Sequence, residues 1–353
     1  MKYPSVAIVI LNFNGIEDTR HCLRSLLKTD YPNFRVIVAD NGSINNEALI
    51  LSKSINDTRV SFIRFKKNYG FTGGNNKVLR SLKEKYIVLL NNDTMVPQSW
   101  LTPLVIQMEK DNRIAVIQPK ILWAKDKKYF DYAGACGGFI DMFGYPFTRG
   151  RIFNSLEPDR GQYNWRCKVL WASGAAMLIR RRVIDIVGLF DESFFNYMEE
   201  IDLCIRIYKV RYKVLCEPSS YIYHKVASTA GRRSDLKRFW EHRNNLLLLL
   251  KHYPLLTLLY IFPLRLCMDY MSILYYLSTG KPLYVLAVIK SQIALMGMIP
   301  QIIRYRKNNS AIKFSDIPKV VYPGSIVFAY FILKLHVFSQ IFDNKYKLKK
   351  ITF

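Results

Sequence analysis

A carboxylate that could hold a metal ion follows a short apolar segment, YIVLL, at residues 86 to 90. Asn91, Asn92, Asp93 and Thr94 come directly after this segment. If the segment is a buried strand, Asp93 lies at its end, where a carboxylate can hold a divalent cation against the phosphates of a ligand. Asn and Asp are also common turn residues, so the same four residues, taken alone, are typical of an Asx turn.

Further carboxylates and a histidine occur near the middle of the chain. Glu199, Glu200 and Asp202 follow the aromatic run FFNYM. Adjacent carboxylates repel, and one near an apolar pocket keeps its proton more readily, which suits a general base. The alternative is a solvated helix face with acids near its positive N-terminal end. His224, in YIYHK, could complete a metal site with Asp93, although a lone histidine is more often structural.

Two segments could bind a nucleotide. Asp40 ends the run VIVAD, where its carboxylate could accept hydrogen bonds from a base or ribose; the alternative is a cap of the following helix. The segment NYGFTGGNN, residues 68 to 76, is rich in glycine and would let the backbone approach a ligand ahead of a helix N-terminus. It is neither a Walker loop nor a GxGxxG motif, so a simple turn is the alternative.

The elements that position these residues alternate between short apolar runs and amphipathic stretches up to about residue 118. This order predicts βαβ units in an α/β fold with a mainly parallel central sheet. The expected strands are 6–11, 35–39, 60–65, 86–90 and 114–118, and the expected helices are 17–29, 44–53, 75–84 and 97–109. Because ligands bind at the carboxyl ends of such strands, the polar residues at those ends indicate one site.

The chain between residues 119 and 225 is less regular. Residues 119–168 lack periodicity, and we expect irregular structure that covers the sheet. After them we expect a loop and a strand at 168–181, a short helix at 182–188, an amphipathic helix at 198–210, and two short strands at 214–218 and 221–225.

The composition excludes some classes of function. The 353 residues are 50% hydrophobic, enough for a sizeable core, and 52 Lys and Arg against 27 Asp and Glu give a net charge of +25. This charge indicates an anionic partner: nucleic acid, an anionic membrane surface or a phosphorylated substrate. No nucleic-acid-binding signature is present, so nucleic acid is not expected. The six cysteines form no CxxC pair, which is typical of free thiols in a reducing compartment.

After residue 245 the composition shifts to Leu, Ile and Tyr with scattered Lys, which predicts two regions, 1–245 and 246–353. No uncharged run in the second region reaches about 18 residues, so three alternatives stay open: helices on the membrane surface, one or two spans, or a soluble helical appendage. Arg265 and Asp269 are four apart and could pair on one helical face. The basic tail at 345–353 would suit anionic lipid. The apolar run 6–11 is too short for an export signal, so we expect the cytoplasmic side of the cell membrane.

Several segments, in order, resemble family 2 glycosyltransferases of the GT-A type, especially the rhamnosyltransferase-like branch. They are VAIVILNFN, VADNGS, NYGFTGGNN, LLNNDT and SGAAMLIRRRVIDIVGLFDESFFNYMEEIDLCIR, within residues 4 to 250. Two positions depart from the family pattern. Glu200 stands where the family usually has Asp, and Asn91 leaves Asp93 as the sole carboxylate of the metal motif.

The resemblance implies roles for named residues. Glu200 would be the base, with Glu199 as a second candidate, and Asp93 and His224 would hold Mg²⁺ or Mn²⁺. The nucleotide-sugar would contact Leu11, Phe13, Asp40, Asn68, Gly70, Asn91 and Asn92, and the acceptor side would comprise Trp171, Ser173 and Gly174.

The resemblance also implies the reaction. A single sugar would pass, with inversion, from a nucleotide-sugar, dTDP-rhamnose or a UDP-sugar, to a hydroxyl of a cell-envelope glycan or lipid-linked oligosaccharide. The segment LKRFW at 236–240 does not match the QxxRW motif of processive synthases, which favours single addition. The alternative is a catalytically silent nucleotide-sugar-binding scaffold. No oligomeric state is predicted.

Overall fold

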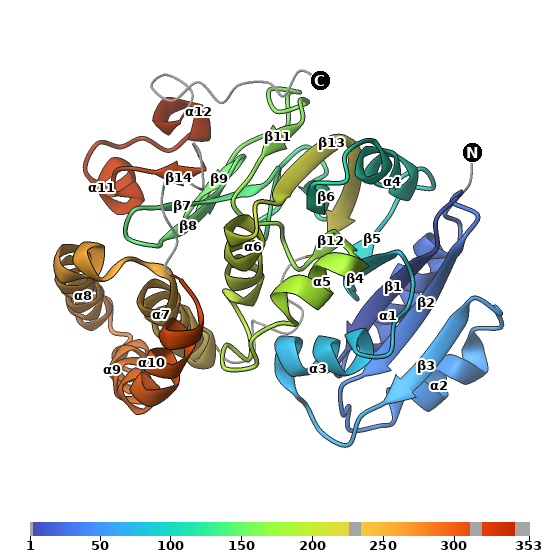
Figure 1. Ribbon diagram of the computed structural model, residues 1–353, viewed down its shortest axis with the longest axis horizontal. Coiled ribbons are helices and arrows are strands. Elements are labelled where there is room, and N and C mark those ends of the chain that lie inside the picture. The colour runs from blue at the N-terminus through green and yellow to red at the C-terminus, as the bar shows by residue number, and fades with distance from the viewer. Residues whose placement is uncertain (1–2, 226–233, 311–319, 343–353) are drawn as a thin grey trace.

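The computed structural model describes residues 3–225, 234–310 and 320–342. Its main sheet has the strand order β11-β13-β6-β12-β4-β1-β2-β3, with β5 paired to β13 (Figure 1). The pairings of β1 with β2 and β4, and of β2 with β3, are parallel, as predicted. These strands are β1 Val6–Asn12, β2 Phe34–Asp40, β3 Val60–Arg64 and β4 Tyr86–Asn91.

The other half of the sheet is mixed. β12 (Ala176–Arg180) lies antiparallel between β4 and β6 (Ile114–Trp123). The predicted pair of short strands is instead one strand, β13 (Lys213–His224), with two register shifts. The shift between Glu217 and Tyr221 accommodates the Pro-Ser-Ser segment, whose proline cannot donate to a ladder. The short strands β5 (Thr94–Met95) and β11 (Cys167–Lys168) pair with β13.

Six helices belong to the same part of the chain: α1 Ile16–Leu26, α2 Glu47–Ser54, α3 Gly70–Leu79, α4 Leu101–Lys110, α5 Arg181–Val187 and α6 Glu199–Lys209. The start predicted for α3, residue 75, is wrong, because the glycine-rich segment is itself helical. A Cβ on Gly74 would lie 2.8 Å from the Leu11 side chain, so this glycine lets α3 pack closely on β1.

The expectation of irregular structure at 119–168 is also wrong. The segment contains β7 (Gly138–Asp141), β8 (Pro146–Thr148), β9 (Arg151–Ile152) and β10 (Ser155–Leu156). With β14 (Val321–Tyr322) they form a second sheet of order β10-β9-β8-β7-β14. These strands are two to four residues long, too short for a periodicity that could be recognised in the sequence.

The C-terminal helices gather at the end of the molecule opposite β1–β3 and α2 (Figure 1). They are α7 Ser234–His252, α8 Leu255–Ser278, α9 Pro282–Gly297 and α10 Ile299–Asn308, followed by α11 Ile326–Phe331 and α12 Phe338–Ile341. The boundary predicted after residue 245 falls inside α7, whose Leu246, Leu247 and Leu248 are buried in the main core. The division into two domains stays a prediction, and the basic tail lies outside the described residues.

Helix α8 buries its charges and exposes its apolar side chains. Arg265 and Asp269 are buried and form the predicted ion pair. Leu256, Leu259 and Leu274 are 78%, 74% and 66% exposed. Within the described residues, only α8 is both long enough and apolar enough to cross a membrane by itself. Helices α9 and α10, which meet at a bend of 54°, are together also long and apolar enough.

Candidate active site

Asp93, His224 and Asp131 form a line of polar side chains at the end of the main sheet, and His224 and Asp131 are buried. The pairing of β5 with β13 places Thr94 opposite His224, so Asp93 comes beside the imidazole. His224 Nε2 lies 3.0 Å from Asp93 Oδ1, and His224 Nδ1 lies 3.1 Å from Asp131 Oδ2. Asn91 Nδ2 lies 3.4 Å from the same Nε2 atom. The structure therefore brings together the two residues proposed as metal ligands.

The charges around His224 determine its protonation. Burial lowers the pKa of His224, but the nearby charges of Asp131 and Asp93 outweigh burial and raise this pKa to about 10. Burial would raise the pKa of Asp93, but the hydrogen bond and charge of His224 lower it below the usual value. In this state the imidazole is charged and bridges two carboxylates, so a metal ion that binds Nε2 would displace the proton there.

The donor set fits a divalent cation. Asp93 Oδ1 and His224 Nε2 face each other, and Asp131 holds the second imidazole nitrogen, an arrangement typical of metal-binding histidines. Among the described residues, no group of three or more His, Cys, Asp or Glu side chains is arranged to hold a metal ion. Two protein ligands would therefore leave positions for phosphate oxygens and water.

Sequence reasoning missed Asp131. This residue is fully buried and lies in the segment that was expected to be irregular. Its role depends on His224, which is far along the chain, so no local pattern could have found it. Its second carboxylate oxygen, Oδ1, is buried without a hydrogen-bond partner in the described part of the chain.

Glu199 and Glu200 are the first two residues of α6. Oε2 of each is buried and has no hydrogen-bond partner within the described ranges. Burial and the charge of Glu200 raise the pKa of Glu199 well above its usual value, and burial raises the pKa of Glu200 to about 7. Glu200 is also the more exposed of the two side chains. Such a carboxylate can accept a proton near neutral pH.

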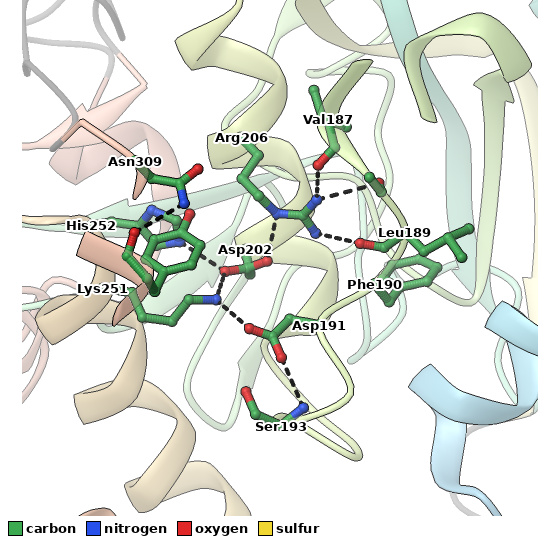
Figure 2. A network of polar contacts seen from close by, with 12 residues as sticks. Val187, Leu189, Phe190, Asp191, Ser193, Asp202, Arg206, Lys251, His252 and Asn309 are labelled. Carbon is green, nitrogen blue, oxygen red and sulfur yellow. Dashed lines mark hydrogen bonds and ion pairs between the residues drawn. The ribbon is translucent and has the colours of Figure 1, made fainter. Parts of the chain in front are cut away.

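Asp202 does not belong to this pair, which corrects the interpretation of three carboxylates as one cluster. Figure 2 shows Asp202 pointing toward the side chains of Lys251 and His252, which belong to α7. Its Oδ1 atom accepts from Lys251 Nζ at 2.5 Å and lies 2.8 Å from His252 Nε2, and its Oδ2 atom accepts from Arg206 Nε at 2.8 Å. Burial would raise the pKa of Asp202, but Lys251 and Arg206 lower it well below its usual range. Asp202 is a structural anion that joins α6 to α7.

The glycine-rich segment is held from the end of β2. Asn41 Nδ2 donates to Asn68 Oδ1 at 2.9 Å and to the Gly70 carbonyl at 3.0 Å. Gly70 has φ +70°, and a Cβ there would lie 2.5 Å from the Phe195 carbonyl. Asn68 is exposed and Gly70 is buried, so the segment presents Asn68 to solvent over a fixed backbone. Asn41 was not predicted as part of this site.

Asp40 is buried, and both of its carboxylate oxygens accept backbone N–H groups. Oδ1 accepts from Ser43 at 3.0 Å and Oδ2 from Ala48 at 3.3 Å, near the start of α2. Asp40 thus accepts an N–H group from the first turn of α2, but the N-cap residue of that helix is Asn46, so the alternative of Asp40 as the N-cap is wrong. A contact between Asp40 and a base or ribose stays a prediction.

Asn92 also has a local structural role. Its Nδ2 atom lies 3.0 Å from Thr19 Oγ1 and 3.3 Å from Asn12 Oδ1, so Asn92 ties the end of β4 to that of β1. Leu11 and Phe13, on either side of Asn12, are half-buried, and contacts between them and a nucleobase stay predictions.

The residues expected on the acceptor side are mostly enclosed. Trp171 is 6% exposed, and its Nε1 donates to the Phe139 carbonyl at 2.9 Å. Ser173 is 2% exposed and donates to the Ala133 carbonyl. Gly174 is half-buried, and a Cβ there would lie 2.8 Å from the Phe71 ring. Packing accounts for Trp171 and Ser173, and a role beside the acceptor stays a prediction for all three.

The fold is similar to that of glycosyltransferases of known structure. The crystal structure of GalNAc-T7 with UDP, GalNAc and Mn²⁺ matches with a TM-score of 0.60 at 16% identity, covering 98% of this chain and 59% of that one. The predicted GT-A fold with a central α/β sheet is confirmed.

Two curated relatives are similar in sequence. The O-antigen biosynthesis protein RfbC of Myxococcus xanthus is 27% identical over 234 residues, which are 66% of this chain and 18% of RfbC. Rhamnosyltransferase WbbL of Escherichia coli is 26% identical over 223 residues, which are 61% of this chain and 82% of WbbL. The resemblance to rhamnosyltransferases is thereby confirmed. The profile described as glycosyl transferase family 2 matches residues 7–187, more than half of the 353 residues, so the chain belongs to this family.

Proposed function

We propose that the protein is an inverting glycosyltransferase that moves one sugar from a nucleotide-sugar to a hydroxyl of a cell-envelope glycan or lipid-linked oligosaccharide. One observation carries this proposal. Glu199 and Glu200 each carry a buried carboxyl oxygen without a partner in the described part of the chain. They directly follow residues 193–198, in which the Phe195 carbonyl accepts hydrogen bonds from the glycine-rich helix α3. The rhamnosyltransferase relatives favour dTDP-rhamnose as the donor, with a UDP-sugar as the alternative.

Glu200 stands at the position for which the family resemblance implies the base, and it is the more exposed of the two carboxylates. Burial and the charge of Glu200 raise the pKa of Glu199 well above its usual value, so Glu199 holds its proton more tightly than an exposed glutamate does. Glu200, with a pKa of about 7, is ionised in a large share of molecules at pH 7 to 8. Glu200 therefore removes the acceptor hydroxyl proton while the oxygen attacks the anomeric carbon from the face opposite the diphosphate, which inverts the configuration.

The leaving diphosphate develops negative charge as the bond between its oxygen and the anomeric carbon breaks. Asp93 and His224 would hold Mg²⁺ or Mn²⁺, which supplies positive charge for that leaving group. Asp131 keeps the His224 ring oriented through Nδ1, so Nε2 stays directed at Asp93. The two contacts of His224 thus orient its ring before the donor binds.

The exposed apolar side chains of α8 support a membrane-bound acceptor. A helix in water normally exposes its charges, but α8 buries Arg265 and Asp269 and exposes leucines. The net charge of +25 would attract this helix and its neighbours to an anionic membrane surface. A lipid-linked acceptor at the cytoplasmic side would meet the enzyme there, with α8 lying on or crossing the bilayer.

Donor identity and base are tested together. A thermal-shift screen of dTDP-rhamnose and UDP-sugars with Mn²⁺ should identify one donor that raises the unfolding temperature with its concentration. Transfer from that donor to envelope lipid extracts should then be lost in Glu200→Gln while donor binding remains. Binding without turnover in the unmodified protein would contradict the proposal and support the silent scaffold.

A further inference from the structure

The segment Ser193–Met198, directly before Glu199, has an unusual backbone. Phe195, Tyr197 and Met198 have φ values of +61°, +69° and +73°, and none of them is glycine. Side chains with a Cβ rarely adopt this left-handed conformation, and it persists only where surrounding contacts hold it. Since Glu199 and Glu200 begin the helix that follows, whatever holds this segment also fixes the two carboxylates.

Helix α3 holds one carbonyl of the segment. The Phe195 carbonyl accepts hydrogen bonds from the backbone N–H groups of Phe71 at 2.9 Å and Thr72 at 3.3 Å. These two residues belong to the first turn of α3, where N–H groups have no partner within the helix. The contact links the segment to the glycine-rich motif.

Helix α7 binds four more carbonyls of the segment, those of Ser193, Phe194, Asn196 and Tyr197. The Asn244 Nδ2 atom lies 2.9 Å from the Phe194 carbonyl and 2.8 Å from each of the carbonyls of Asn196 and Tyr197, which share its two hydrogens. Arg243 Nη2 donates to the carbonyls of Ser193 at 2.8 Å and Phe194 at 3.1 Å. Five consecutive carbonyls, from Ser193 to Tyr197, are thus held by α7 or α3.

Arg243 also fixes the orientation of the Asn244 amide. Arg243 Nε donates to Asn244 Oδ1 at 2.8 Å, so the amide oxygen faces the guanidinium and the NH₂ group faces the carbonyls. Asn244 is fully buried, and an aromatic contact reinforces the site, because the Trp240 ring stacks on Phe195 with centroids 5.2 Å apart. Helices α6 and α7 are also linked at the far end of α7, where Lys251 pairs with Asp202 and with Asp191 (Figure 2).

We propose that Arg243 and Asn244 are positioning residues for sugar transfer, which hold Ser193–Met198 so that Glu200 meets the acceptor hydroxyl. This role rests on the proposed function of Glu200 as the base. In this proposal α7 supports the active site on one side. It also packs against α8 and α9, the helices with exposed apolar side chains.

The neighbouring residue provides a matched control. Asn245 is also buried, at 3% exposure, but its Nδ2 donates to the Gly144 carbonyl at 2.6 Å and its Oδ1 accepts from Arg265. Asn244→Ala and Asn245→Ala each remove a buried amide from adjacent positions of one helix. Only the first loses bonds to Ser193–Met198.

The test compares the two variants in the full chain by hydrogen–deuterium exchange and by kinetics. We expect Asn244→Ala to speed amide exchange in the peptide containing residues 193–198, and to lower kcat at least tenfold with the donor KM changed less than threefold. Asn245→Ala should leave both exchange and kcat near the unmodified values. If Asn244→Ala does not fold, Arg243→Lys replaces it in the test. Lysine keeps the positive charge but cannot make the Arg243 bonds to Asn244, Ser193 and Phe194 together, so exchange should be faster and kcat lower.

The outcomes separate this proposal from the proposed function. If Glu200→Gln is inactive but Asn244→Ala matches Asn245→Ala in exchange and kcat, the positioning role is overturned and the base assignment stands. If turnover survives in Glu200→Gln, the base assignment itself is wrong, and the positioning role that rests on it is overturned too.

Discussion

His224 Nδ1 lies 3.1 Å from Asp131 Oδ2, and this contact leaves the opposite nitrogen, Nε2, facing Asp93. Asp131 lies between β6 and β7, and His224 ends β13, so two separate parts of the fold meet at the imidazole. The contact gives the proposed metal site a carboxylate behind its histidine, which orients the ring and increases the basicity of the nitrogen that would bind the cation.

We therefore expect Asp131→Asn to weaken Mn²⁺ binding about 10- to 100-fold, because the isosteric amide keeps the shape but removes the charge behind His224. Isothermal titration with Mn²⁺ in the presence of the nucleoside diphosphate measures this change. Asp126→Asn is the control, since the Asp126 side chain bonds to the Lys128 N–H in a nearby turn. Equal Mn²⁺ affinity in the two variants would contradict a role for Asp131 at the metal.

The pH dependence of transfer should report Glu200. This residue accepts a proton only when ionised, and burial raises its pKa to about 7, so kcat should fall about tenfold per pH unit below that value. An exposed glutamate would place this limb near pH 4.3. Rates measured from pH 5 to 9 at saturating Mn²⁺ and donor give the midpoint. Glu200→Asp should keep an acidic limb at lower kcat, whereas a limb unchanged in Glu200→Gln would assign it to another group.

Local patterns predicted local contacts well. An apolar run followed by polar residues predicted the strand 86–90 and placed Asp93 just after it. A spacing of four residues on a helix predicted the ion pair of Arg265 and Asp269. The same reasoning failed for Asp202, which belongs by spacing to the carboxylates of α6 but points to Lys251 on α7. Asp131 and Asn244 could not be predicted, because their partners come from distant segments and a single buried amide or carboxylate has no periodicity.

Gly70 is a position where substitution should disturb two segments. Its φ of +70° disfavours any Cβ, and that Cβ would lie 2.5 Å from the Phe195 carbonyl. We expect Gly70→Ala to lower the free energy of unfolding by about 1–3 kcal/mol and to weaken donor binding. Gly297→Ala is the control, because nothing lies within 4 Å of its Cβ position, and alanine should stabilise α9 by up to about 1 kcal/mol. Denaturant unfolding checks both, and a neutral Gly70→Ala would show that this backbone is not required.

The ion pair of Lys251 with Asp202 should contribute strongly to stability. Lys251→Met leaves a fully buried carboxylate with one fewer cation, and removal of one partner of a buried pair costs about 3–5 kcal/mol. Lys251 and Arg206 hold the pKa of Asp202 well below its unfolded value, so this stabilisation is present above about pH 4 and is lost as pH falls through the folded pKa. Denaturant unfolding at pH 7 measures the loss. The double variant Asp202→Asn/Lys251→Met should be less unstable than the sum of the single variants, and strict additivity would contradict a coupled pair.

The exposed leucines of α8 should control binding to lipid. Leu259 and Leu274 are 74% and 66% exposed, and burial of each in a bilayer contributes about 1.5–3 kcal/mol. We expect Leu259→Glu/Leu274→Glu to weaken binding to vesicles with one-quarter anionic lipid at least 100-fold in co-sedimentation. Ile44→Glu is the control, because Ile44 is 82% exposed and shortly precedes α2, a helix that lies at the end of the molecule opposite α8 (Figure 1). High salt should weaken binding of the unmodified protein only in part, since screening removes the attraction of basic side chains to lipid but not the burial of leucine. Equal losses in the α8 and Ile44 variants would show that charge, and not the α8 surface, determines lipid binding.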